Sequence, residues 1–240
     1  DGKMRKVEGL DTYVEFAHGP EADTVLVEEN GARFEVPLAG GQKTGWFYDH
    51  RMNRQRLQAY APGKKVLDVF SYVGGWGIQA ACAGASQVTC VDASSAAVDA
   101  VHHNAKLNGL ENVDTIEGDA FDALKALADE KEKFDIVVLD PPALIPRRRD
   151  QKAGEQAYAR LNQLGLRLLE RDGLLVSASC SMHLSQEKLI DIIRSSGRKI
   201  DRFVQLLEQG HQAPDHPIVP GIPETDYIKS CFVRSLTGFL

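Results

Sequence analysis

Glycine, acidic and cysteine residues recur at five places along the chain, each directly after a short apolar run. The five segments are D-V-F-S-Y-V-G-G-W-G (68–77), V-D (91–92), G-D-A (118–120), D-P-P-A (140–143) and S-C-S (179–181). Glycines allow a ligand close to the backbone, carboxylates accept hydrogen bonds from hydroxyl and amino groups, and a thiolate is a strong nucleophile. Residues of these types are suited to holding a nucleoside-containing cofactor beside a reactive sulfur.

The elements that carry these segments follow an α/β pattern from residue 65 onward. Strands are expected at 66–70, 88–92, 112–117, 134–140, 174–180, 200–206 and 228–234, and helices at 75–84, 96–107, 120–131, 154–170 and 186–196. Near-continuous apolar strands that alternate with helices form a mostly parallel sheet covered on both faces. Such sheets bind ligands beyond the carboxyl ends of their strands. The five segments are therefore predicted to lie along one edge of a seven-stranded sheet.

A β-hairpin is predicted before this pattern. The run T-V-L-V-E-E-N-G-A-R-F-E-V-P-L (24–38) contains two β-prone stretches around Asn30-Gly31. Asn-Gly readily adopts the two positive φ angles of a type I′ turn, which joins paired strands. A glycine-rich stretch follows, and a helix is expected at 51–60. The hairpin is therefore interpreted as a small β extension of the main domain.

The glycine segment Gly75–Ala80 fits G-x-G-x-x-A, a pattern that alone does not identify the cofactor. Asp92 is placed to accept hydrogen bonds from both hydroxyls of a ribose. Three features favour S-adenosylmethionine: Asp68 can orient loop amides or an ammonium group, Asp119 can accept from an adenine amino group, and D-P-P-A is rigid because proline fixes φ. A nicotinamide-dependent oxidoreductase is the alternative, but it leaves Asp119, D-P-P-A and S-C-S unexplained. Asp119 also suits a helix N-cap.

The overall composition limits the class of protein. The 240 residues include 43% hydrophobic and 26% charged residues, with a net charge of −6. This charge excludes a globally basic nucleic-acid binder, so any RNA contact requires a local basic patch, for which Arg147, Arg148 and Arg149 are the candidates. Four dispersed cysteines without a C-x-x-C pair argue against a disulfide scaffold or a zinc finger. No secretory signal or membrane span is recognisable, so a cytoplasmic protein without a metal is expected.

Six segments resemble a known family. G-Q-K-T-G-W-F-Y-D-H-R (41–51), F-S-Y-V-G-G-W-G (70–77), D-P-P-A, S-C-S, D-H-P (215–217) and P-E-T-D-Y-I-K (223–229) resemble class I methyltransferases, and more closely the bacterial large-subunit ribosomal RNA cytosine-C5 methyltransferases. The resemblance spans about residues 20–235 and implies a Rossmann-like domain at 51–240, with residues 1–50 forming the β extension and a cofactor lid. Members of that family usually carry an N-terminal RNA-binding PUA module, which this chain does not include.

The resemblance also implies roles for individual residues. The expected cofactor-binding set is Lys43, Thr44, Phe47, Arg51, Asp68, Phe70, Ser71, Tyr72, Gly74, Gly77, Asp92, Ala93, Ser94, Asp119, Ala120, Asp140 and Pro141. Cys180 is the candidate nucleophile that adds to cytosine carbon 6, which makes carbon 5 electron-rich. Asp140 is the candidate acid partner at cytosine N3, and the base that removes the carbon-5 proton is left open between water, Asp140 and another ionised side chain.

Two other functions remain open on the sequence alone. Related methyltransferases act on guanine, so a methyltransferase for guanine or a small molecule is one alternative, and Cys180 would then be dispensable. A non-catalytic RNA-binding or scaffold protein that retains the fold is another. The remaining cysteines, Cys82, Cys90 and Cys231, are expected to be core residues.

Overall fold

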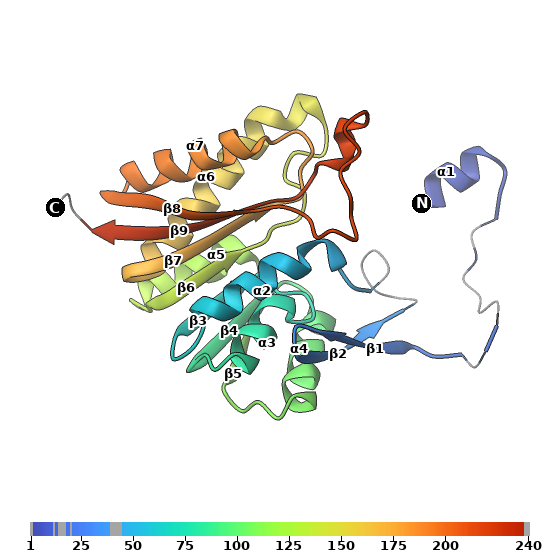
Figure 1. Cartoon of the computed structure of the whole chain (residues 1–240), viewed down its shortest axis with the longest axis horizontal. Helices are drawn as coiled ribbons and strands as arrows, with labels where there is room; N and C mark the ends of the chain where they lie inside the picture. Colours follow the sequence, from blue (N-terminus) through green and yellow to red (C-terminus); the bar gives the residue numbers. More distant parts are fainter. Residues whose placement is uncertain (1, 12, 14–17, 20, 39–44, 238–240) are drawn as a thin grey trace.

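A seven-stranded sheet forms the centre of the computed structural model, which describes residues 2–11, 13, 18–19, 21–38 and 45–237 (Figure 1). Its strands are β3 (Lys65–Val69), β4 (Gln87–Asp92), β5 (Val113–Glu117), β6 (Phe134–Leu139), β7 (Leu169–Ser179), β8 (Arg202–Gly210) and β9 (Lys229–Thr237). The helices that accompany it are α2 (Arg51–Tyr60), α3 (Gly75–Cys82), α4 (Ser95–Leu107), α5 (Ala120–Asp129), α6 (Gln151–Leu168) and α7 (Gln186–Arg198), and a separate short helix, α1 (Gly2–Val7), precedes them.

The order of the strands places a topological switch point in the middle of the sheet. The order is β5-β4-β3-β6-β7-β9-β8, with β3 to β7 parallel and β9 antiparallel to both of its neighbours. The chain runs outward from β3 in one direction and from β6 in the other, so the connections diverge where these two strands meet. The prediction of a mostly parallel seven-stranded sheet is confirmed.

Helices cover the two faces of the sheet with separate hydrophobic cores. Leu57 of α2, Ile78 of α3 and Val101 of α4 belong to one buried cluster. Leu124 of α5 and Leu161 of α6 belong to the other, together with residues of α7. The strands supply both clusters because successive side chains point to opposite faces. Among the described residues, no helix combines the length and apolar character needed to cross a bilayer.

The predicted hairpin is present and packs against the domain. Its strands β1 (Thr24–Glu29) and β2 (Ala32–Pro37) are joined by Asn30 and Gly31, whose φ angles are 52° and 83°. The side chain of Phe34 is fully buried in the core shared with α3 and α4. On α4, Asn104 Oδ1 accepts a hydrogen bond from the Glu35 amide at 2.8 Å. The hairpin is therefore fixed to the domain by both apolar packing and hydrogen bonds.

The boundaries of β7 differ from the prediction. The strand begins at Leu169, directly after α6, whereas the sequence pattern places its start at residue 174. The polar run Glu170–Gly173 forms an irregularity in the ladder, where the β6–β7 register shifts and Asp172 adopts a φ of 62°. The helix expected at 154–170 therefore ends two residues earlier, at Leu168. Cys90 and Cys231 are buried as expected, but Cys82 is exposed at the end of α3.

Candidate active site

The turn after β3 brings the glycine segment against the sheet. Phe70, Tyr72 and Gly74 have φ angles of 66°, 50° and 87°, and left-handed non-glycine residues of this kind gather at functional sites. Gly77 lies in the first turn of α3, where an added Cβ would come within 2.6 Å of Cys90 Sγ. Glycine at this position therefore allows α3 to pack closely on β4. Ser71 is buried within the same turn.

Asp68 lies inside β3 and is fully buried. Its Oδ2 accepts a hydrogen bond from the Gly77 amide at 2.8 Å, and its Oδ1 is buried without a hydrogen-bond partner among the described residues. Burial raises the pKa of Asp68 to about 7, and the charges of Asp140 and Asp92 reinforce this, while the Gly77 hydrogen bond opposes it. One oxygen of Asp68 thus orients the glycine loop, and the other remains available to a ligand.

Replacing Asp68 by asparagine is expected to stabilise the protein above neutral pH relative to the wild type. The wild-type carboxyl has a pKa of about 7 when folded and an ordinary value of 3.8 when unfolded, so its contribution to stability is lost as pH rises between these values. Asparagine keeps an oxygen for the Gly77 amide and does not titrate. The difference in the free energy of unfolding between the variant and the wild type should therefore grow by a few kcal/mol as pH rises, since each unit of pKa shift corresponds to about 1.4 kcal/mol. Urea unfolding at about pH 5 and about pH 8 measures it, and an equal difference at both would contradict the raised pKa.

The acids after β4 and β5 both bind backbone amides. Asp92 is half-buried and accepts from the Tyr72 amide at 2.9 Å and from the Ser94 amide at 3.0 Å. Asp119 is exposed, and its Oδ1 caps α5 by accepting from the amides of Phe121 and Asp122. The helix N-cap anticipated for Asp119 is therefore present. Each carboxylate can still accept further hydrogen bonds, because each oxygen has two lone pairs.

The residues beside these two acids complete the predicted cofactor edge. Ala93 and Ser94 are exposed after β4, and Ser94 is the N-cap of α4. Ala120 is buried as the first residue of α5. Asp119 follows β5, Asp92 is the last residue of β4 and Asp68 is the next-to-last residue of β3, so the three acids form a row near one edge of the sheet.

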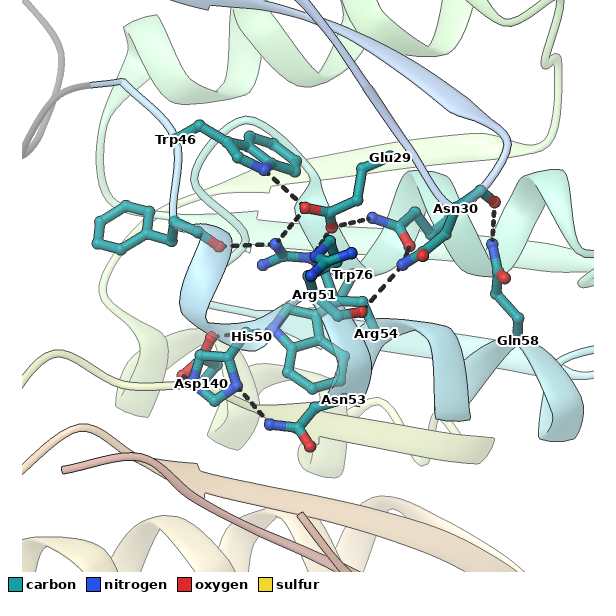
Figure 2. Close-up of polar contacts among 12 residues, drawn as sticks. Glu29, Asn30, Trp46, His50, Arg51, Asn53, Arg54, Gln58, Trp76 and Asp140 are labelled. Atoms are coloured by element: carbon teal, nitrogen blue, oxygen red, sulfur yellow. Dashed lines mark hydrogen bonds and ion pairs between the residues drawn. The ribbon is translucent and has the colours of Figure 1, made fainter. Parts of the chain in front are cut away.

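Asp140, which follows β6, is held by two aromatic residues that the sequence analysis did not select. Trp76 Nε1 donates a hydrogen bond to Asp140 Oδ2 at 2.9 Å, and His50 Nε2 lies 3.4 Å from Asp140 Oδ1 (Figure 2). Asn53 Nδ2 donates to His50 Nδ1, so a neutral His50 carries its proton on Nε2, the atom facing Asp140. Pro141 is buried directly after Asp140. Asp140 is thus a carboxylate surrounded by N–H groups at the centre of the sheet edge.

The three residues before and at the start of α2 each contain a buried polar atom without a hydrogen-bond partner among the described residues. These atoms are Asp49 Oδ1, Arg51 Nε and His50 Nε2, and the last of them lies within ion-pair distance of Asp140 without forming a hydrogen bond. Other atoms of the same residues are engaged: Tyr227 donates to Asp49 Oδ2 at 3.1 Å, and an Arg51 nitrogen lies 3.2 Å from Asp215 Oδ2. Unpaired buried polar atoms are costly unless a ligand or water satisfies them. They therefore mark a polar binding site at this segment.

The same segment contacts the glycine loop through Phe47. The Phe47 ring lies edge-on to Tyr72, with ring centroids 5.8 Å apart. Two further members of the predicted lid, Lys43 and Thr44, lie outside the described residues. The described part of the lid therefore adjoins the predicted cofactor loop.

A buried ion pair fixes this segment to the hairpin. Arg54 of α2 donates to both carboxylate oxygens of Glu29, at 2.6 and 3.0 Å, and both side chains are buried (Figure 2). Trp46 and Gln79 also donate to Glu29, at 2.9 Å each. Arg54 further donates to the Phe47 carbonyl. These contacts fix Trp46 and Phe47 to both the hairpin and α2.

Cys180 lies at the carboxyl end of β7, next to the strand that precedes Asp140. It is half-buried, and the two serines beside it are fully buried. Tyr158 of α6 contacts both serine hydroxyls, Ser179 at 2.8 Å and Ser181 at 3.0 Å. Ser181 also accepts a hydrogen bond from the Ile145 amide, in the loop that follows D-P-P-A. These contacts fix the backbone on both sides of the Cys180 thiol.

An open groove of about 960 Å³ adjoins the Cys180 turn. Residues 182–187 after β7, Gly210 at the end of β8 and the loop before β9 line it, together with Arg148. Arg147 and Arg149 are exposed in the same loop as Arg148. The predicted basic patch is thus at the solvent surface, and one of its members borders the groove.

Comparisons with known proteins agree with this geometry. The S-adenosylmethionine-dependent methyltransferase family matches residues 4–223. Ribosomal RNA large subunit methyltransferase I of Aeromonas salmonicida is 38% identical over 98% of this chain and 60% of its own length, and that of Klebsiella pneumoniae is 36% identical over 98% and 59%. The chain thus spans about 60% of the length of these curated relatives.

A solved structure shares the fold. The methyltransferase SMU.776, complexed with SAH, superposes with a TM-score of 0.80 at 26% identity, over 90% of this chain and 57% of its own. The family match decides against the oxidoreductase alternative for Gly75–Ala80. With its sheet order, glycine loop and aligned acids, the chain belongs to the S-adenosylmethionine-dependent methyltransferase family.

Proposed function

We propose that the protein methylates carbon 5 of a cytosine in large-subunit ribosomal RNA, through a covalent bond between Cys180 and the base. The observation that carries the proposal is the fixed position of Cys180, which directly follows β7, the strand paired with β6, just as Asp140 directly follows β6. The two relatives named above are ribosomal RNA large subunit methyltransferases, which supports RNA as the substrate.

The residues that would hold S-adenosylmethionine are those of the predicted set. The unsatisfied Asp68 Oδ1 and Arg51 Nε are suited to its ammonium and carboxylate groups, respectively, and Asp92 and Asp119 to its ribose and adenine. Phe47 and the turn of Phe70–Gly74 would cover its apolar parts. When bound, S-adenosylmethionine supplies a methyl group activated by a sulfonium.

The chain's own residues would prepare the cytosine. The Cys180 thiolate adds to carbon 6. The electron pair of the C5–C6 double bond then moves onto carbon 5 and is shared through carbon 4 with N3, so carbon 5 becomes nucleophilic. Asp140 and N3 of the base would share one proton, which offsets the negative charge that the addition places on N3, and the N–H groups of Trp76 and His50 position the Asp140 side chain. After carbon 5 has gained the methyl group, a base removes its proton and the thiolate leaves as the double bond re-forms. Water and Asp140 both remain candidates for that base.

Neutralising Arg147, Arg148 and Arg149 together by glutamine is expected to weaken RNA binding in a salt-dependent way. Each lysine or arginine that contacts a phosphate adds about 0.7 to the slope of log affinity against log salt for single-stranded nucleic acid. The triple variant should therefore lose roughly 2 units of slope. Filter binding to ribosomal RNA fragments across a salt series measures it. An unchanged slope would show that the patch does not contact phosphate.

The direct test uses the purified full chain, labelled S-adenosylmethionine and unmodified large-subunit ribosomal RNA. Nucleoside mass spectrometry is expected to find 5-methylcytidine in the treated RNA. A methylated guanine would show that the alternative base is the substrate, and label in small molecules alone would remove RNA from the proposal. Binding of S-adenosylmethionine without any transfer would favour a non-catalytic RNA-binding protein.

A further inference from the structure

Lys229 is a buried lysine next to the Cys180 turn. It is the first residue of β9, its register partner on β7 is Ser179, and its side chain is 5% exposed. Its Nζ donates a hydrogen bond to the Ser181 carbonyl at 2.8 Å and another to the Tyr227 carbonyl at 3.0 Å. Lys229 is therefore tied to the residue that directly follows Cys180.

Among the described residues, Lys229 has no directly contacting carboxylate, although the charge of Asp226 acts on it from farther away. Within the described part of the chain, no carboxylate lies within ion-pair distance of Lys229, and its two acceptors are neutral carbonyls. An ammonium group has three N–H donors, so one is left after these two hydrogen bonds. Lys229 also lines the groove beside Cys180. A buried cation without a paired anion is costly and requires a functional explanation.

The titratable groups around Cys180 come from several parts of the chain. Tyr158 of α6 interacts with Cys180 electrostatically, as do Lys229, the first residue of β9, and Tyr227, which precedes β9. Asp226 acts on Lys229, and Asp49 and Asp215 act on Tyr227. Burial raises the pKa of both tyrosines, so they are neutral at physiological pH. Burial lowers the pKa of Lys229, while the charges of Asp226 and Cys180 oppose that change. Lys229 and Cys180 therefore stabilise each other's charged forms.

We infer that Lys229 is a positioning residue that keeps Cys180 as a thiolate and fixes the turn on which the thiol is carried. A cation beside a cysteine favours loss of the thiol proton, and the half-buried Cys180 can release that proton to solvent. The inference deepens the proposed function and rests on it, because addition to carbon 6 requires a thiolate. It also assigns a role to the strand β9, which supplies no residue to the predicted cofactor set.

The test measures the reactivity of Cys180 without RNA or methyl transfer. The full chain carries Cys82→Ala, because Cys82 is exposed whereas Cys90 and Cys231 are buried. Iodoacetamide pulses across a pH series, followed by peptide mass spectrometry, give the pH at which Cys180 is half reactive. That pH is expected to lie below the value for glutathione in the same tube. In Lys229→Met it should rise by about one unit or more, and Lys229→Arg should retain the low value.

The control is Lys188→Met, which removes an exposed lysine of α7 that pairs with Glu155 at 3.0 Å. This variant should leave the titration unchanged. The inference would be overturned if, in the Cys82→Ala protein, the pH at which Cys180 is half reactive were equal to or above the value for glutathione. This outcome counts even if Lys229→Met fails to fold. The inference would also be overturned if Lys229→Met still bound S-adenosylmethionine and the pH at which Cys180 is half reactive were unchanged. If the shift occurs but Cys180→Ala still methylates RNA, the inference about the thiol holds and the covalent mechanism fails.

Discussion

Replacing Cys180 by alanine is expected to lower methyl transfer to RNA by at least about 10³-fold and to leave S-adenosylmethionine binding unchanged. The change removes the group proposed to add to carbon 6, without which carbon 5 of cytosine is a poor nucleophile. Cys180 follows β7, whereas the predicted cofactor residues of the sheet edge follow β3 to β6, so the cofactor site should remain intact. Incorporation of labelled methyl groups into ribosomal RNA measures the first effect, and calorimetry with S-adenosylmethionine measures the second.

The matched control is Cys82→Ala, which removes an exposed thiol at the end of α3 and should retain full activity. RNA containing 5-fluorocytidine provides an independent test, because fluorine at carbon 5 blocks the final proton removal. The wild type should form a protein–RNA adduct that survives denaturation, and Cys180→Ala should form none. Normal turnover by Cys180→Ala would exclude the covalent route and favour a substrate that needs no cysteine nucleophile.

Replacing Arg54 by methionine is expected to destabilise the protein by about 3–5 kcal/mol, because it leaves the Glu29 carboxylate buried and without its cation. Arg54 also donates to the Phe47 carbonyl and lies 4.8 Å from the centroid of the Trp46 ring. The variant should therefore bind S-adenosylmethionine more weakly in addition to being less stable. The urea midpoint measures the loss of stability, and calorimetry on the folded fraction measures the affinity.

Arg56→Met on the same helix is the control for this prediction. Arg56 forms a half-exposed ion pair with Glu208 at 3.5 Å, and exposed pairs of this type contribute at most about 1 kcal/mol. The double change Arg54→Met with Glu29→Leu should recover part of the lost stability, since no charge is then left unpaired. Equal losses for Arg54→Met and Arg56→Met would contradict the central role of the buried pair.

β3, β4 and β6 were predictable because burial on both faces produces near-continuous apolar runs, whereas β5, at the edge of the sheet, is partly exposed and has a mixed pattern. β3, β4, β5 and β6 each agree with the prediction to within one residue at either end. The hairpin was predictable from Asn30-Gly31, since few residue pairs adopt positive φ at both positions of a tight turn. These features depend on neighbouring residues, so their patterns are visible in the sequence alone.

The supporting residues of the site were not predictable in the same way. His50 lies within a segment that the sequence analysis quoted, but only the fold brings it to Asp140, which is 90 positions later. Tyr158 has no local signal, since a tyrosine in an amphipathic helix is most simply explained as a core residue. Its hydrogen bonds to Ser179 and Ser181 depend on how α6 packs against β7. Contacts of this kind follow from tertiary packing and leave no regular spacing in the sequence.

The insertion of β9 between β7 and β8 has a consequence for protein synthesis. A nascent chain emerges from the ribosome with its N-terminal part first, so the glycine loop and Asp68 can fold well before β9 is available. Lys229 and Tyr227 arrive only when the final strand enters the sheet beside β7. If Lys229 supports the Cys180 thiolate as inferred above, the thiol gains this support only after β9 has joined the sheet beside β7.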